Sequence, residues 1–239
     1  MNVMKYGISP LYQVMEQIEC YILKNHLKSH DKFSGERKLC EIFGCNRVTL
    51  RNAFECLENA GKTYSIQGMG NYVAEKKIEI CLVQYNSFYQ HLRKLHQQPA
   101  LEILSVKKEE AVPKIARHLG ILPGSSVWET KTIVILQDIP VIFETSWLCA
   151  EKYPEISGEH LGKEEIYEVF QKQYHIDLEY GSETIGITSA QEEEAEYLEI
   201  DDNTPLFFVQ KTGKTKTESV IYTQAMVRPD KIQFVSVLK

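Results

Sequence analysis

Residues 46–60 read Asn-Arg-Val-Thr-Leu-Arg-Asn-Ala-Phe-Glu-Cys-Leu-Glu-Asn-Ala, and this stretch decides the fold of the first third of the chain. Its apolar residues follow the i, i+3, i+4, i+7 spacing that places side chains on one helical face; they are Leu50, Ala53, Phe54 and Leu57. Arg47 and Arg51 lie one turn apart on another face. The pattern predicts a helix over 46–60 with one buried face and one basic face.

The residues on either side of this helix predict its neighbours. A short helix is expected at Glu36–Phe43, and Gly44 after it can adopt the left-handed conformation that ends a helix. Two short helices joined by a glycine turn, with cations in the first turn of the second, are typical of a helix-turn-helix. Strands are expected at 63–66 and 71–74, around a glycine-containing loop. This hairpin is a candidate wing, because its glycines let backbone amides approach phosphates.

Four blocks of this region resemble, in order and spacing, the winged helix-turn-helix of the GntR family of bacterial transcription factors. They are Pro10-Leu11-Tyr12, Glu36-Arg37-Lys38-Leu39, residues 46–54 and Gly68-Met69-Gly70-Asn71-Tyr72-Val73. The resemblance implies that this domain binds double-stranded operator DNA through Arg37, Asn46, Arg47, Thr49, Arg51, Gly68, Met69 and Gly70. The chain departs from the family pattern at Met69, where a basic residue is usual, and at Ser34-Gly35 and Asn46, where Pro-Ser and serine are usual.

The composition is that of a globular protein, and 239 residues allow two domains of ordinary size. The sequence contains neither a membrane-length apolar run nor an apolar N-terminal segment, so we expect a cytoplasmic protein with no membrane partner. The net charge of -6 is unevenly divided, because residues 1–74 carry +2 and the remainder carries -8. The six cysteines show no CxxC pair and no zinc-like spacing with histidine, so we expect buried reduced thiols, no metal site and no cofactor.

An internal repeat organises the rest of the chain. A helix is expected over 10–27 and a linker over 76–86. Beyond it, five positions recur 79 residues later: Ala116, Leu119, Ile121, Gly124 and Val127 match Ala195, Leu198, Ile200, Asn203 and Leu206. Each half then runs helix, strand, short helix and β-hairpin, and two copies would pair into one antiparallel sheet with helices against it. Chance similarity between two amphipathic units would give the same five matches.

The second half of the chain resembles the UTRA domain, the effector domain of the HutC branch of the GntR family. The matching pieces are Ser87-Phe88, residues 116–120, Asp138-Ile139-Pro140-Val141, Glu144-Thr145-Ser146, Ile166-Tyr167 and Arg228-Pro229-Asp230. The resemblance implies an α+β fold similar to chorismate lyase that binds a small metabolite, often a sugar phosphate, and forms a homodimer. The expected organisation is therefore a DNA-binding domain at 1–75, a linker at 76–86 and an effector-binding and dimerisation domain at 87–239.

Candidate effector-binding residues follow from the same resemblance. Glu144 matches the family's ligand-binding glutamate, and Lys131, Ser87, Phe88, Tyr167 and Tyr222 complete the candidate set. A solvated strand carboxylate and two core tyrosines are the alternatives for Glu144, Tyr167 and Tyr222. The family's Arg-x-Arg pair is missing from residues 129–134, and no arginine occurs between Arg117 and Arg228. A guanidinium is the preferred ligand of phosphate, so a weakly charged or neutral effector is favoured.

The sequence therefore predicts a DNA-binding transcriptional regulator, a repressor, whose operator affinity depends on a small metabolite. Two alternatives remain at this point: an enzyme of chorismate-lyase-like fold, or a ligand-independent regulator that binds DNA or protein. The enzyme is disfavoured because the sequence shows no nucleophile–base pair, no metal-ligand spacing and no glycine-rich nucleotide loop.

Overall fold

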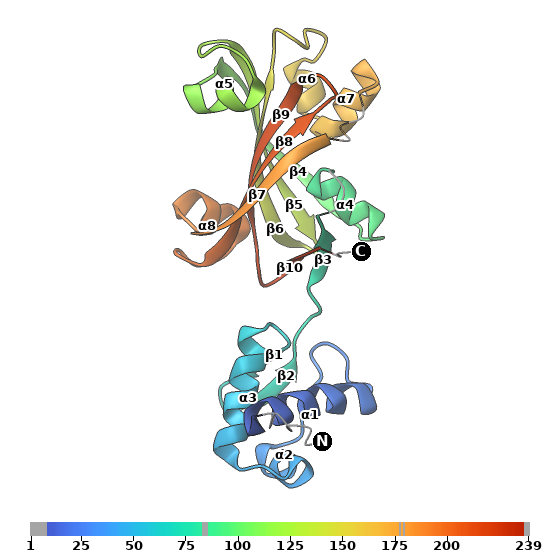
Figure 1. Cartoon of the computed structure of the whole chain (residues 1–239), viewed down its shortest axis with the longest axis vertical. Helices are drawn as coiled ribbons and strands as arrows, with labels where there is room; N and C mark the ends of the chain where they lie inside the picture. Colours follow the sequence, from blue (N-terminus) through green and yellow to red (C-terminus); the bar gives the residue numbers. More distant parts are fainter. Residues whose placement is uncertain (1–8, 83–85, 177, 179, 237–239) are drawn as a thin grey trace, which may run out of the picture. The chain divides into compact units, whose positions relative to one another are not determined.

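The computed structural model describes residues 9–82, 86–176, 178 and 180–236. The chain divides into two compact units, Met1–Ile78 and Glu79–Lys239, and each is described by itself (Figure 1).

The first unit is a three-helix domain with a β-hairpin. Its elements are α1 (Pro10–Lys24), α2 (Glu36–Phe43), α3 (Arg47–Asn59), β1 (Thr63–Ile66) and β2 (Gly70–Val73). The four apolar residues of α3 that define the predicted face are all buried, and they pack with Val14 and Ile18 of α1 and Leu39 of α2. Gly44 ends α2 with φ of 64°. Two elements differ slightly from the prediction, because α1 ends at Lys24 and the second strand begins at Gly70.

The second unit is built on a six-stranded antiparallel sheet of order β4-β5-β6-β9-β8-β7. Its elements are β3 (Ile78–Cys81), α4 (Phe88–Lys94), β4 (Ala100–Glu110), α5 (Pro113–Leu119), β5 (Ser126–Leu136), β6 (Ile139–Cys149), α6 (Gly158–Leu161), α7 (Ile166–Tyr174), β7 (Tyr180–Ser189), α8 (Glu192–Leu198), β8 (Pro205–Lys214), β9 (Ser219–Val227) and β10 (Ile232–Val235). The predicted repeat is confirmed, because α4-β4-α5-β5-β6 and α7-β7-α8-β8-β9 follow the same order and meet where β6 pairs with β9.

Helices cover both faces of this sheet. In Figure 1, α5 and α8 lie on one side, and α4, α6 and α7 lie on the other. Because successive side chains of a strand point to opposite faces, each central strand contributes to two cores. On β6, Leu148 packs with residues of α6 and α7, whereas Trp147 packs with residues of α5. The sequence of β6 is therefore almost uniformly buried instead of alternating.

The segment expected to be a linker contains a strand. Residues 78–81 form β3, which pairs with β10 and so joins the second unit; residues 83–85 of the expected linker lie outside the described residues. The cysteines are free, as expected, but Cys149 alone among them is classed as buried and Cys20 is exposed. Among the described residues, no helix combines the length and apolar character needed to cross a membrane.

The glycine that ends α2 gives a direct test of the helix-turn-helix. A Cβ added at Gly44 would meet no atom within 4 Å, so the cost of Gly44→Ala comes from the left-handed backbone alone. We expect a loss of about 1–2 kcal/mol in the unfolding free energy of this unit. Gly44→Asn is the matched control and should cost less, because asparagine tolerates this conformation. Calorimetry of the full chain measures the unfolding free energy of both variants. Equal losses would contradict a left-handed conformation at Gly44.

Candidate functional site

The N-terminus of α3 presents short polar side chains. Asn46 is its N-cap, and its Oδ1 accepts hydrogen bonds from the Thr49 backbone N–H at 2.8 Å and from the Thr49 hydroxyl at 3.1 Å. Asn46 remains exposed beside Arg47, and Thr49 is half-buried. Capping thus fixes the helix end while its polar groups stay accessible.

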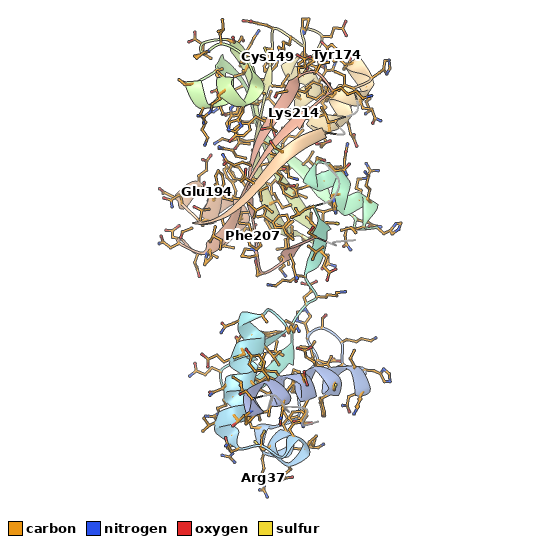
Figure 2. The ribbon with its side chains drawn as sticks, in the orientation of Figure 1. Arg37, Cys149, Tyr174, Glu194, Phe207 and Lys214 are labelled. Carbon is orange, nitrogen blue, oxygen red and sulfur yellow. The ribbon has the colours of Figure 1, made fainter. Side chains whose placement is uncertain are left out.

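Two arginines of the predicted DNA-contact set have acidic partners. Arg51 donates two hydrogen bonds to the Glu36 carboxylate, at 2.8 and 3.0 Å, which holds α3 against the start of α2. These bonds, together with the charges of Arg51 and Arg47, lower the pKa of Glu36. Arg37 is 85% exposed, pairs with Glu41 at 3.3 Å and points away from the domain in Figure 2. The role of Glu36 in orienting Arg51 is not visible in the local sequence pattern, because the two residues are 15 positions apart.

The wing has the backbone that its glycines require. Gly68 and Gly70 have φ values of 74° and 113°, and Met69 between them is exposed. A groove of about 560 Å³ runs between this loop and the α2–α3 region, and Lys32 and Arg51 supply cations to its lining. A Cβ at Gly70 would lie 3.5 Å from Cε of Lys32. The wing therefore has the cation of Lys32 beside it, although Met69 itself is uncharged. No local sequence pattern marked Lys32, because its position depends on an isolated β-bridge to Tyr72.

A small cavity lies in the second unit, between the sheet and the α6–α7 region. Its volume is about 20 Å³, which is room for about one water molecule. The lining combines carboxylates, hydroxyls and apolar groups: Leu101, Thr130, Thr132, Glu144, Ser146, Leu161, Glu164, Glu165, Ile166 and Tyr167. Thr132 faces Glu144 across the β5–β6 pair and Thr130 faces Ser146, so these strands supply the polar floor.

Two of the lining carboxyl groups are buried. Burial raises the pKa of Glu144 to about 7, and the charge of Lys211 opposes this rise. Burial also raises the pKa of Glu165 to about 8, with repulsion from Glu144 as the next cause. Glu165 is the N-cap of α7, where its carboxylate accepts the backbone N–H of Glu168 at 3.2 Å, and it lies 3.5 Å from Nε2 of Gln90 on α4.

A buried lysine links this region to the start of α4. Nζ of Lys211 lies 3.3 Å from a carboxylate oxygen of Glu183, 3.3 Å from the carbonyl oxygen of Asn86 and 3.5 Å from the centre of the Phe88 ring. Burial lowers the pKa of Lys211, while Glu183 and Glu144 raise it. Sequence analysis missed Lys211 and Glu165. The sequence pattern does indicate a buried position for Lys211, because it shares a strand face with the apolar Phe207 and Val209.

The structure separates the six predicted effector residues into groups. Glu144 and Tyr167 line the cavity together. Ser87, the N-cap of α4, and Phe88 lie on the same side of the sheet but do not line the cavity. Tyr222 and Lys131 are a correction, because both face the opposite side. Tyr222 is buried between His118 and Trp147, and Lys131 forms an ion pair with Glu193 of α8.

The raised pKa of Glu144 makes stability depend on pH. A carboxyl whose folded pKa exceeds its unfolded value stabilises the fold while protonated, and this stability is lost as pH rises through the folded value. Glu144→Gln removes this penalty, so its unfolding free energy should exceed that of the native chain by roughly 2–3 kcal/mol at pH 8 and by little at pH 5. Both tryptophans, Trp128 and Trp147, lie in the second unit, so urea unfolding followed by tryptophan fluorescence reports on it.

Glu192→Gln is the control for this measurement, because Glu192 is exposed on α8. It should leave the difference in stability between pH 5 and pH 8 unchanged. A Glu144→Gln protein with the same pH dependence as the native chain would contradict the burial of a charged carboxyl at this position.

Two family patterns match the chain, one over each unit. The pattern of the UTRA domain matches residues 83–233, and that of the bacterial regulatory proteins of the gntR family matches residues 11–73. Among curated proteins, the chain is similar to the HTH-type transcriptional repressor NagR of Bacillus subtilis, with 26% identity over 98% of this chain and 97% of that protein. It is also similar to the mannosyl-D-glycerate transport/metabolism system repressor MngR of Escherichia coli, with 30% identity over 63% of each.

Solved structures show the same fold. PhnF from Mycobacterium smegmatis has a TM-score of 0.66 at 21% identity, covering 95% of this chain and 99% of that one. The regulator YydK from Bacillus subtilis has a TM-score of 0.59 at 19% identity. The families and relatives are regulators of transcription, which removes the enzyme alternative. The chain belongs to the gntR family of bacterial regulatory proteins, as a DNA-binding transcriptional regulator with a C-terminal UTRA effector domain.

Proposed function

We propose that this regulator represses transcription by binding a near-palindromic operator as a homodimer, and that a metabolite held at the Glu144 cavity controls that binding. The observation that carries the first part is the exposed polar and basic N-terminus of α3 beside a glycine wing. The buried, partly hydroxyl-lined cavity carries the second part. Such a protein acts on chromosomal DNA in the bacterial cytoplasm.

The DNA contacts follow from the position of each side chain. The start of α3 enters the major groove, where Arg47 and Arg51 contact base edges or phosphates and Asn46 and Thr49 add hydrogen bonds. Arg37 contacts the phosphate backbone from α2. The wing residues Gly68, Met69 and Gly70 approach the minor groove, and Lys32 provides the charge that Met69 lacks. These assignments rest on exposure and on the family resemblance.

The effector changes operator affinity by favouring one arrangement of the two units. The size of that change equals the difference in the effector's affinity for the two arrangements. The bond from Lys211 to the carbonyl of Asn86 supports such coupling, because it joins the cavity side of the sheet to the residue that precedes α4. Several relatives are named for the use of sugar derivatives, such as MngR and a probable fructoselysine utilization repressor of Escherichia coli. We therefore place the effector among small sugar-related metabolites.

Replacing Arg37, Arg47 and Arg51 together by alanine should abolish specific binding. The operator is first obtained by selecting random DNA duplexes with the full-length protein. The triple variant should then lose its preference for this duplex, and the slope of log affinity against log salt should fall by up to about five, since a dimer loses as many as six phosphate contacts at about 0.9 each. Arg93→Ala with Arg117→Ala in the second unit is the control. Retained specific binding by a folded triple variant, checked by circular dichroism, would refute the proposal.

Changing Met69 to arginine tests the wing in the opposite direction. The added cation should strengthen operator binding and steepen the salt dependence by about one further phosphate contact. The matched control is Leu122→Arg, at an exposed position in the second unit, which tests whether any added charge has the same effect. An unchanged affinity and salt slope for Met69→Arg would place the wing away from the DNA.

A further inference from the structure

The cavity of the second unit has an unusual charge balance for a site that would hold an anion. Of the described residues that line it, three are glutamates and none is lysine, arginine or histidine. Glu164 at the rim is already paired with Lys172 at 2.7 Å. Glu144 and Glu165 therefore remain as the acidic groups that face the interior.

Lys211 does not reverse this balance. It is not part of the lining, and its ammonium group already contacts Glu183, the Asn86 carbonyl and the Phe88 ring. An anion in the cavity would have to draw Lys211 away from these three partners. It would also stand beside two carboxyl groups, so both desolvation and repulsion oppose it.

Glu144 lacks a partner of its own. Its side chain is more than nine-tenths buried and lines the cavity, yet within the described part of the chain no hydrogen bond or ion pair reaches its carboxylate. Glu165 is better satisfied, because backbone N–H groups of Glu168 and Tyr167 donate to its carboxylate and Nε2 of Gln90 lies 3.5 Å away. Buried polar groups are ordinarily satisfied, so an unpartnered carboxylate that faces a cavity indicates a missing donor.

We infer that the effector is a small hydroxylated compound with a cationic amino group, which Glu144 and Glu165 bind while Thr130, Thr132 and Ser146 take its hydroxyls. An ammonium group offers three donors, which would supply the carboxylate of Glu144 with the donor that it lacks and add one to Glu165. Tyr167 and Leu161 provide the apolar wall. This inference rests on the proposed function, because it names the effector class of the same cavity.

Binding of such a cation must release protons. At neutral pH the two carboxyl groups are partly protonated, and an ammonium group favours their charged form. Other charged or titratable groups on this side of the sheet are Lys211, Glu183, His91, Glu164 and Glu168. Between pH 6 and pH 7 the charged fraction of a carboxyl of pKa about 7 rises about fivefold while the amine stays mainly protonated, so the affinity for the amine should rise by a similar factor.

Access requires movement, because about 20 Å³ holds no more than a water molecule. The turn between α6 and α7, where Glu165 caps α7, forms one wall of the cavity. A ligand that engages this carboxylate therefore acts on the helix start directly. Entry should be accompanied by a change in hydrogen exchange of α7 that Glu144→Gln abolishes.

The test is isothermal titration of the full-length protein with matched compounds that differ only in charge. Each set contains an amino sugar, its N-acetyl derivative, the parent hexose and the amino sugar 6-phosphate, starting from glucosamine, galactosamine and mannosamine. We expect an amine to bind, N-acetylation to weaken its binding at least tenfold, and the affinity for the amine to rise about fivefold from pH 6 to pH 7. Heats measured in two buffers of different ionisation enthalpy should show proton release.

Variants and competing outcomes separate the two proposals. Glu144→Gln should abolish amine binding, whereas Glu192→Gln on the opposite face should not change it. A neutral or phosphorylated member that binds as tightly as its amine, or an affinity that falls as pH rises, overturns the inference and leaves the proposed function standing. Absence of binding by every member, and by a wider panel of anionic, neutral and cationic metabolites, overturns the proposed effector site itself.

Discussion

The antiparallel pairing of β6 with β9 is the contact on which the second unit depends. Within the described residues, the two repeats share a ladder here and nowhere else, from Ile142 opposite Val227 to Leu148 opposite Ile221. A slip of one residue in this pairing would turn Glu144 to the face covered by α5 and α8. It would also turn the other side chains of the strand to the opposite face of the sheet. The hydroxyl pair of Ser146 and Thr223, joined across these strands at 2.7 Å, lies inside this register. The alignment of the strands therefore determines which of their side chains face the cavity, and the α6–α7 region completes its lining.

The elements that sequence predicted best are those with a strong local pattern. The four apolar residues of α3 repeat with helical spacing, and Gly44 marks the end of α2, so both were located nearly to the residue. The repeat was visible because each copy keeps the same order of helix, strand and hairpin. By contrast, the ends of α1 and the pairing of β3 with β10 depend on contacts that local periodicity does not encode.

The candidate site was predicted only in part, and for a geometric reason. Glu144 could be chosen from a motif, but the face occupied by Lys131 depends on which residue of β5 stands opposite Glu144. That residue is Thr132, so Lys131 points the other way. Tyr222 is separated from Glu144 in the same manner, since it stands opposite Trp147. Glu165 looked like an ordinary residue before a helix, and its burial follows from packing against the sheet.

The internal duplication gives each half of the sheet a position that corresponds to the Thr132–Glu144 pair. A shift of 79 residues carries Thr132 and Glu144 onto Lys211 and Thr223, and each pair is in register across its own hairpin. The first copy thus has the acid Glu144 where the second has the hydroxyl of Thr223. It has the hydroxyl of Thr132 where the second has the base Lys211. A fold with two equivalent positions has in this way been left with a single asymmetric centre. The two copies are therefore chemically different at this position, and of the two it is the first that places a carboxylate there.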